Sequence, residues 1–379
     1  MEKIYFDYAA TTPTDPRVAQ ALAPYFADQF GNPSSPHSWG QQGLAALENS
    51  RKIIADFIGA RPEEIVFNSG ATEANNHAIF GIARAHRLKG NHIIISALEH
   101  HSVHEPVEKL KEDGFKVTYI KVNKEGLIDP NDVKKAITDK TILIAAIHAS
   151  NEIGTIQPVE TIGKIARENR IPFLVDAVQT VGHIPVNVDQ LNADLLSFSG
   201  HKFYGPKGIG VLYIRSGTAV APLLFGGDQE KGRRASTQNV PAIVGMAKAI
   251  QLCQAQMSEE GNVQSALRDK LLVEVPKRIT GVKINGDRHK RLPNNAHFSF
   301  EGLQGESLLM SLDMANIAAS MGSACTSGAM EPSAILRAIG LSDELALGSL
   351  RITLGRWTKE EHIDYFLDQL PKIVNSLRI

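Results

Sequence analysis

The chain has 379 residues, of which 43% are hydrophobic and 21% are charged, and this composition is ordinary for a soluble globular protein. Lysine and arginine total 40 and aspartate and glutamate total 41, so the formal net charge is −1. Such an even balance gives no reason to expect nucleic acid or an anionic membrane as the main partner.

Apolar runs and segments of helical period alternate along the first part of the chain. We expect strands at residues 65–67, 93–96, 117–122, 142–146, 172–177, 195–199 and 210–214. Helices are expected around and between them, at residues 44–58 with Gly59 as a stop, 72–89 with Gly90 as a stop, 103–110, 132–137 and 162–168. This alternation predicts a mostly parallel sheet that is covered by helices on both faces. The longest apolar run, at about 141–149, is far shorter than the roughly 20 residues of a membrane helix, so no membrane partner is expected.

The pattern changes after a helix that we expect at residues 241–257. Strands at 296–300 and 349–354 then mix with helices at 306–314 and 358–377, and Thr358 with Glu361 forms a possible capping box for the last helix. A chain of this length suits two domains. We therefore predict an α/β protein with a large domain over residues 15–257 and a smaller α+β domain formed by residues 1–14 and 258–379.

Ligands of parallel sheets bind beyond the carboxyl ends of the strands, and polar residues gather there. Ser69 to Thr72 could bind an anion at a helix N-terminus, although a tight strand-to-helix turn needs the same small residues. Asp176 ends an apolar strand, where it could hold the proton of a pyridine nitrogen or simply cap the next turn. Lys202 follows another strand and could form a Schiff base if its pKa is lowered, although most lysines are simply solvated. The turn, the aspartate and the lysine, each at a strand end and in this order, together favour a pyridine cofactor.

Over nearly its whole length the sequence resembles the cysteine desulfurases, which share the class V aminotransferase fold type. The matching stretches are DYAATTP at 7–13, FGNPSS at 30–35, SGATE at 69–73, EHH at 99–101, NEIG at 151–154, DAVQ at 176–179, SGHK at 199–202 and GSACTS at 322–327. The resemblance implies fold type I of the pyridoxal-phosphate-dependent transferases, pyridoxal 5'-phosphate as cofactor, L-cysteine as substrate and a homodimer.

The resemblance also implies a role for each matching residue. Lys202 would bind the cofactor covalently, Asp176 would pair with its ring nitrogen, and His100 would stack on the ring and could shuttle protons. The phosphate ligands would be Ala71, Thr72, Ser199 and His201, and the ring oxygen would lie near Asn151 and Gln179.

Two further residues are implied outside the large sheet, and Asn151 would also lie near the substrate. Arg351 would clamp the substrate carboxylate, which a guanidinium fork can bind through two hydrogen bonds. Thr237 would reach the phosphate of the neighbouring subunit. Relatives usually have glycine directly before this threonine, whereas this chain has Ser236, which is costly if the turn needs a positive φ.

The two cysteines lie in different surroundings. Two are too few for a disulfide framework and favour a reducing compartment, and residues 1–7 show no secretory signal, so we expect a cytoplasmic enzyme. Cys253 falls on the apolar face of a helix and is interpreted as a small buried hydrophobic residue. Cys325 lies in a stretch of small residues, 318–329, that is typical of a loop, where a structural or incidental role is open beside a reactive thiolate.

The resemblance assigns the reactive role to Cys325. It implies that L-cysteine becomes L-alanine while the sulfur stays on Cys325 as a persulfide. Residues 331–333 resemble the subgroup with a long catalytic loop, which hands sulfur to an iron–sulfur scaffold or another acceptor protein. A selenocysteine lyase could use the same residues, and a non-catalytic protein of this fold would be expected to lack Lys202, Asp176 or Cys325. His100 and His104 have the spacing of two ligands on a helix, but no third ligand is near in sequence and no metal is expected.

Overall fold

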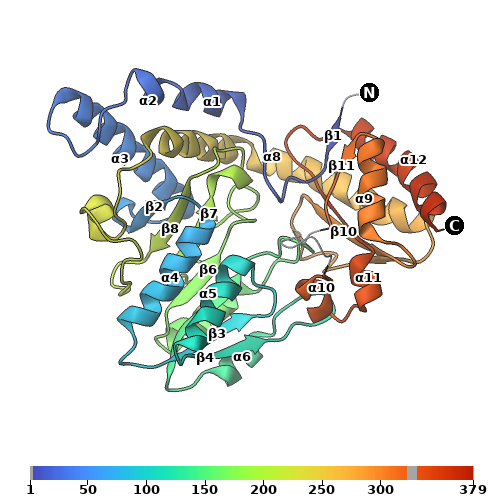
Figure 1. The fold of residues 1–379 in the computed structure, drawn as a ribbon, viewed down its shortest axis with the longest axis horizontal. Coiled ribbons are helices and arrows are strands. Elements are labelled where there is room, and N and C mark those ends of the chain that lie inside the picture. Colours follow the sequence, from blue (N-terminus) through green and yellow to red (C-terminus); the bar gives the residue numbers. More distant parts are fainter. Residues whose placement is uncertain (1–2, 322–330, 379) are drawn as a thin grey trace.

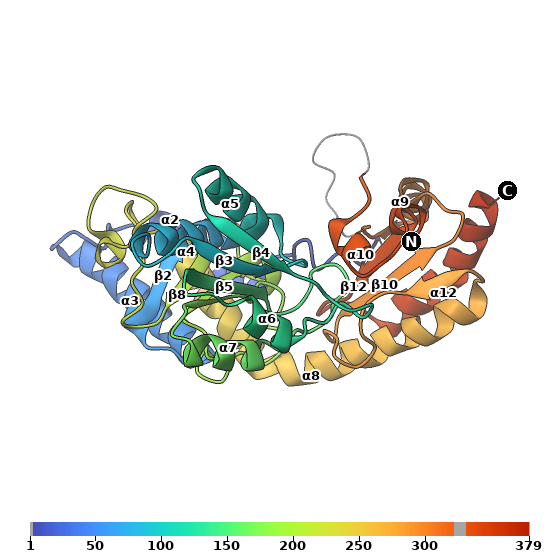
Figure 2. The ribbon, with the colours of Figure 1, turned by 90° about the horizontal axis from the view of Figure 1, so that it is seen from below.

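The computed structural model describes residues 3–321 and 331–378. Its elements form two groups, one around a seven-stranded sheet and one around a three-stranded sheet (Figure 1). The long helix α8 (Val240–Arg278) runs along the base of both groups (Figure 2). A short parallel pair, β1 (Ile4–Tyr5) with β11 (Ile317–Ala318), joins the start of the chain to the second group.

The large sheet has the strand order β2-β8-β7-β6-β5-β3-β4, and only β8 runs antiparallel to its neighbours. The predicted α/β fold with a mostly parallel sheet is therefore confirmed. The strands are β2 (Ile65–Asn68), β3 (His92–Ser96), β4 (Lys116–Ile120), β5 (Thr141–Ile147), β6 (Phe173–Asp176), β7 (Leu195–Ser199) and β8 (Gly210–Ile214).

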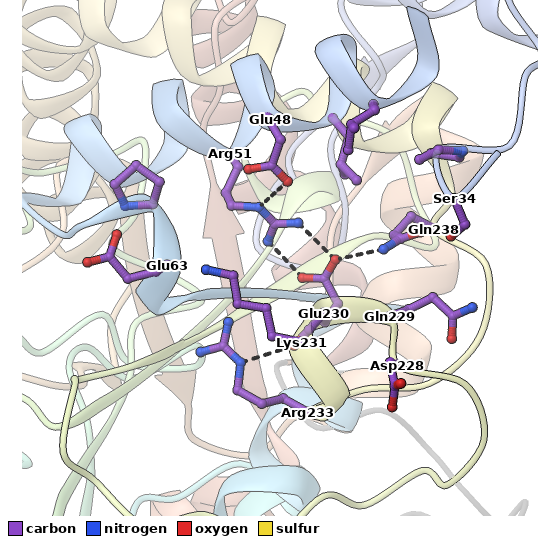
Figure 3. Close-up of a pocket in the computed structure, with 14 residues that line it drawn as sticks. Ser34, Glu48, Arg51, Glu63, Asp228, Gln229, Glu230, Lys231, Arg233 and Gln238 are labelled. Atoms are coloured by element: carbon purple, nitrogen blue, oxygen red, sulfur yellow. Dashed lines mark hydrogen bonds and ion pairs between the residues drawn. The ribbon is translucent and has the colours of Figure 1, made fainter. Parts of the chain in front are cut away.

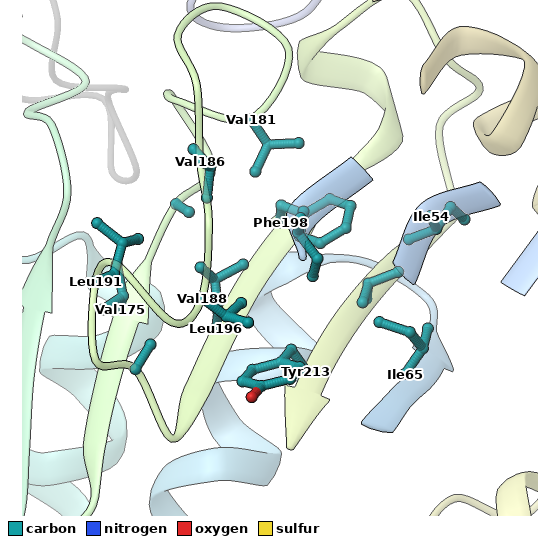
Figure 4. Packing of buried hydrophobic residues seen from close by; sticks show 14 of the residues in the cluster. Ile54, Ile65, Val175, Val181, Val186, Val188, Leu191, Leu196, Phe198 and Tyr213 are labelled. Carbon is teal, nitrogen blue, oxygen red and sulfur yellow. The ribbon is translucent and has the colours of Figure 1, made fainter. Parts of the chain in front are cut away.

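Helices cover both faces of this sheet, because strand side chains point alternately to its two sides. Ile94 packs into one core, whereas its neighbours Ile93 and Ile95 pack into the other. One face is covered by α4 (Ala71–Ala85) and α5 (His101–Glu112), and the other by α3 (Ser38–Ile58), α6 (Pro130–Ala136), α7 (Val159–Glu168) and the first half of α8. In Figure 4, Ile54 of α3 lies over side chains of the central strands. Burial on both faces explains why these strands form continuous apolar runs in the sequence.

The second group is α+β. Its antiparallel sheet has the order β12-β10-β9, built from β9 (Val282–Ile284), β10 (Asn295–Phe300) and β12 (Ser349–Thr353). The second half of α8, α9 (Gly305–Met314) and α12 (Glu360–Leu377) pack against it in a separate core. Two short helices, α10 (Ala334–Ala338) and α11 (Asp343–Leu347), form a small core with Leu98, Ile147 and Ile153 of the first group.

Three local predictions were wrong. Helix α8 continues to Arg278 instead of ending at 257, because Leu267, Leu271 and Val275 bury its far half in the second core. The domain boundary expected at residue 257 thus falls inside an unbroken helix, and it stays a prediction. Helix α4 ends at Ala85, before the expected stop. The last helix has Lys359 as its N-cap, because the Thr358 hydroxyl instead accepts from the Gly355 N–H at 3.0 Å.

Further short helical elements lie before the sheet and between its strands and helices. Helices α1 (Pro16–Leu22) and α2 (Pro24–Ala27) lead into α3, and each has a proline in its first turn. Single turns of 3₁₀ helix form η1 (Pro62–Glu64) and η2 (Gly200–Lys202), whereas η3 (Gln229–Gly232) contains two residues with non-helical backbone. Within residues 3–321 and 331–378, no helix is both long and apolar enough to cross a membrane.

Candidate active site

Lys202 lies in η2, directly after the carboxyl end of β7. Its Nζ donates hydrogen bonds to the carbonyl oxygens of Ala9 and Ala10, each at 2.8 Å. Burial lowers the pKa of Lys202 to about 8, and the charge of Arg351 acts in the same direction, against the opposite effects of Asp176 and Asp7. A neutral amine, which a nucleophile needs, is therefore accessible close to neutral pH.

The turn that carries Lys202 is held from the N-terminal segment. The hydroxyl of Thr12 donates to the carbonyl oxygen of His201 at 3.0 Å and accepts from the backbone N–H of Tyr204 at 2.7 Å. The Nε2 atom of His183 contacts the carbonyl oxygen of Lys202 at 3.0 Å. These contacts fix the backbone around the lysine from both sides of the turn.

Asp176 ends β6 and is only 3% exposed. Its Oδ1 accepts from the Val178 N–H at 3.0 Å, and its Oδ2 accepts from Asn75 Nδ2 at 3.0 Å. Burial raises the pKa of Asp176, while the charges of His100 and Lys202 and these two hydrogen bonds act against that rise. A buried carboxylate of this kind can pair with a cationic nitrogen of a ligand.

His100 is the N-cap of α5, and the residue is exposed. Its Nδ1 lies 2.9 Å from Ser102 Oγ and accepts from the Ser102 N–H at 3.1 Å. Desolvation by the surrounding protein lowers the pKa of His100; Asp176 acts against this, and Lys202 and His101 add to it. Since Asp176, Lys202 and His100 influence one another electrostatically, the structure brings these three predicted residues together.

The turn before α4 has the geometry of an anion site. Gly70 supplies no side-chain cap, so the first N–H groups of the helix, including those of Ala71 and Thr72, point outward from its positive end. A Cβ on Gly210 would lie 2.6 Å from the Cα of Gly70, so the close approach of β8 requires glycine there. Ser199 is adjacent, since a Cβ on Gly70 would lie 3.8 Å from its Oγ.

His201 is a further candidate anion ligand beside this turn. Its Nδ1 contacts Thr11 Oγ1 at 3.1 Å, and burial lowers its pKa to about 4. The imidazole is therefore neutral, and it can donate to an anion from a protonated Nε2 without bringing a charge.

Arg351 reaches the same place from the small sheet and is 3% exposed. Its Nη2 pairs with Asp7 Oδ1 at 2.7 Å, and its Nη1 donates to the carbonyl oxygen of Asn151 at 2.8 Å. The buried Nε of Arg351 and the buried Oδ1 of Asn151 have no partner within the described ranges. A buried donor and acceptor of this kind normally have a partner, so a small polar ligand suits this position. Gln179 lies nearby, and its Nε2 donates to the carbonyl oxygen of Ala9 at 3.1 Å.

The sequence-based reasoning gave no role to Asp7, Asn75, Ser102 or Thr12. Asp7 and Thr12 lie inside the motif DYAATTP, which was their only signal. Asn75 lies one turn after Thr72 on the buried face of α4. A polar side chain on a buried helix face indicates a hydrogen-bond partner, and this was its signal in the sequence. Apart from the contact of Ser102 with His100, their partners are distant in sequence, so those contacts follow only from the fold.

One predicted residue, Thr237, is not joined to this site. Thr237 is exposed, and no hydrogen bond or ion pair in the described part of the chain joins it to the other candidates. Cys325 lies outside the described residues. The other cysteine, Cys253, is buried as predicted, with its pKa raised to about 12 by burial. Among the described residues, no group of three or more histidine, cysteine, aspartate or glutamate side chains could hold a metal.

The backbone before Thr237 has the conformation that glycine favours. Ser236 has φ of 91°, and Glu230 and Lys231 also have positive φ, at 49° and 58°. The turn therefore does need positive φ at residue 236, and this chain meets the need with a strained serine.

A cavity of about 410 Å³ lies beside this turn and away from Lys202. It is crossed by a buried pair, in which both nitrogens of the Arg51 fork contact Glu230, at 2.7 and 2.9 Å (Figure 3). Glu230 also accepts from the Phe67 N–H at 3.0 Å and from Gln238 Nε2 at 3.2 Å. Although burial raises the pKa of Glu230, the contacts with Arg51 hold it below its usual range. The pair thus anchors the segment that carries Ser236 and Thr237.

Comparisons with known proteins agree on one family. The family model described as "Aminotransferase class-V" matches residues 4–366. A protein named "Cysteine desulfurase IscS" from Dictyoglomus turgidum is 52% identical over 376 residues, which cover 99% of this chain and 95% of that protein. A solved structure named "NIFS-LIKE PROTEIN" superposes with a TM-score of 0.93 at 36% identity, covering 99% of this chain and 100% of the other. Another, "SspA in complex with cysteine", has a TM-score of 0.82 at 38% identity and covers 93% and 98%.

Proposed function

The chain belongs to the class V aminotransferase family, in its cysteine desulfurase branch, and we propose that it uses pyridoxal 5'-phosphate to remove sulfur from free L-cysteine, leaving L-alanine. One observation carries the proposal. The buried carboxylate of Asp176 and the guanidinium of Arg351 both lie close enough to the half-buried amine of Lys202 to shift its pKa. The similar protein solved with cysteine supports the choice of substrate.

The residues at this place fit the cofactor. Its phosphate is an anion, and the uncapped N-terminus of α4 suits an anion. Its ring nitrogen is basic, and Asp176 offers a buried carboxylate that two donors already orient. When bound, pyridoxal phosphate supplies an aldehyde carbon that reacts with amines and a ring that withdraws electrons from the substrate.

We assign the binding roles as follows. Lys202 binds the cofactor covalently, Asp176 holds the proton of its ring nitrogen, and His100 lies against the ring. Asn151 and Gln179 contact the polar edge of the ring. Backbone and side-chain donors bind the phosphate, from Ala71, Thr72, Ser199 and His201.

Arg351 and Lys202 handle the substrate. The unpartnered Nε of Arg351 and the remaining hydrogens of its fork bind the cysteine carboxylate, beside the unpartnered Oδ1 of Asn151. The amine of Lys202 takes the proton from the substrate Cα. Its lowered pKa supports this role, because a base works best when its pKa lies near the working pH.

Cys325 takes the sulfur in this proposal. Its thiolate attacks the substrate sulfur, a sulfur–sulfur bond forms, and the substrate Cβ–S bond breaks with its electron pair passing to the carbon. That carbon takes a proton and the product becomes alanine, so no external oxidant or reductant is needed. The persulfide then passes its outer sulfur to an acceptor protein, such as an iron–sulfur scaffold or a thiolation enzyme. The match of residues 322–327 to the family motif supports the assignment.

The test uses peptide mass spectrometry of the holoenzyme after addition of L-cysteine. The peptide with Cys325 should gain one sulfur atom, while the peptide with the buried Cys253 should gain none and serves as the internal control. Replacing Cys325 by alanine should keep the cofactor absorbance and abolish alanine production. Normal alanine production by that variant would refute the role of Cys325.

A homodimer in the cytoplasm completes the proposal. Several large apolar side chains are exposed at the end of the molecule that holds α2, the start of α3 and the 224–225 segment, and they suit a protein interface. They are Phe26, Phe30, Trp39, Leu224 and Phe225. Thr237 is exposed, which supports a contact with the partner's phosphate. Sedimentation at low protein concentration tests the dimer, and cell fractionation tests the compartment.

A further inference from the structure

A chain of buried side chains connects Asp176 to His100. Its central member, Asn75 on α4, is fully buried, with 0% of its surface exposed. The Nδ2 atom of Asn75 donates to Asp176 Oδ2 at 3.0 Å and to Ser102 Oγ at 2.9 Å. Ser102 Oγ in turn lies 2.9 Å from Nδ1 of His100. Three hydrogen bonds thus link two residues of the proposed cofactor site.

The donor and the acceptor of each hydrogen bond can be assigned in turn, starting from Asp176. The carboxylate of Asp176 accepts, so Asn75 must face it with its amide nitrogen. Both amide hydrogens of Asn75 are then used, and the second is donated to Ser102. Since the Ser102 oxygen accepts this bond, its single hydrogen is free to be donated to His100 Nδ1.

Nδ1 of His100 therefore faces two donors, the hydroxyl and the backbone N–H of Ser102, the latter at 3.1 Å. A nitrogen that accepts both bonds carries no hydrogen, and the ring proton must be on Nε2. Adding a proton to Nδ1 would set it against the Ser102 N–H and would break the chain. Cationic His100 is thus unfavourable for a geometric reason.

Charged groups around the ring act in both directions. Asp176 favours the cation, whereas Lys202 and His101 oppose it, and the His101 ring is centred 6.1 Å away. Partial desolvation of the ring by the surrounding protein also opposes the cation. On the described elements that pack around His100, these are the charged or titratable groups that act on it.

We propose that Asn75 and Ser102 are positioning residues that hold His100 as the neutral tautomer with its proton on Nε2. In this state His100 donates a hydrogen bond from Nε2 toward the bound ligand and does not take up the substrate proton, which leaves that task to Lys202. Only the identity of the ligand rests on the proposed function, because the tautomer follows from contacts within the chain.

The test is nitrogen NMR of the holoenzyme labelled with ¹⁵N-histidine, in which the signals of His100 are assigned from a His100→Gln variant. In the native protein we expect a protonated Nε2 and a bare Nδ1 at pH 8, with titration only below the ordinary histidine range. Replacing Ser102 by alanine removes one donor to Nδ1, so the pKa of His100 should rise by about half to one unit. The exposed His101 is the internal reference and should not shift.

Two results would overturn the proposal: a proton on Nδ1 in the native protein, or an unchanged pKa of His100 in the Ser102→Ala variant. The cofactor absorbance of that variant shows whether its site is intact. Turnover of L-cysteine by the native enzyme is measured separately. Its absence would refute the proposed function without affecting the tautomer, which the NMR experiment reads directly.

Discussion

The lowered pKa of Lys202 makes a prediction about cofactor uptake, because only the neutral amine reacts with an aldehyde. Two charges near it can be removed separately. Arg351 lowers this pKa and Asp7 raises it, and the two are paired at 2.7 Å. Replacing Arg351 by methionine leaves Asp7 uncompensated, so the pKa of Lys202 should rise. Replacing Asp7 by asparagine leaves Arg351 uncompensated, so that pKa should fall.

The expected size of the effect follows from the neutral fraction. With a pKa of about 8, roughly 10% of the amine is neutral at pH 7, against about 0.03% for an ordinary lysine with its pKa near 10.5. Burial and the neighbouring charges together therefore account for about 300-fold in the reactive fraction. A neighbouring charge shifts a pKa by roughly one unit, so at pH 7 the uptake rate should fall about tenfold for Arg351→Met and rise about fivefold for Asp7→Asn.

The assay mixes cofactor-free enzyme with pyridoxal phosphate and follows the absorbance of the bound cofactor by stopped flow, at pH values from about 7 to 10. The native rate should rise about fivefold between pH 7 and pH 8 and level off above pH 8. The levelling point should move up for Arg351→Met and down for Asp7→Asn. A native rate that keeps rising to pH 10, or a shift of both variants in the same direction, would refute the reasoning.

Three further predictions concern the substrate contact, a strained turn and the buried ion pair. Replacing Arg351 by lysine keeps the charge but loses the fork, so kcat/KM for L-cysteine should fall roughly 10- to 150-fold, mainly through KM; an unchanged KM would contradict the carboxylate contact. Replacing Ser236 by glycine should relieve the strain of φ at 91° and stabilise the protein by about 0.5–1 kcal/mol, seen as a higher thermal midpoint, whereas the matched Ser236→Ala variant should bring no gain. Replacing Glu230 by glutamine leaves Arg51 with only the half-exposed Glu48 as an ion-pair partner and should destabilise by about 3–5 kcal/mol, measured by denaturant unfolding. Also replacing Arg51 by methionine should recover much of that loss. Equal losses in the single and double variants would show that the pair is not coupled.

Much of the fold could be predicted because local patterns report burial directly. The strands of the large sheet are buried on both faces, so each forms a short apolar run that turn residues interrupt. The end of α8 could not be predicted, since the polar stretch after Met257 interrupts the apolar period while the helix continues to its second core. The cap of α12 was missed because Thr358 has a competing partner in Gly355.

By itself the sequence determined the fold class, the family and which residue types stand after each strand, because these depend on local order along the chain. The placing of Lys202 and Asp176 at one edge of the sheet follows from the rule that parallel strands end together. Only the tertiary structure decided what surrounds those groups. Asp7 meets Arg351 across 344 positions, and Asn75 meets Asp176 across 101. The pKa of Lys202 and the tautomer of His100 depend on desolvation and on hydrogen-bond partners from distant segments, and no local pattern reports either one.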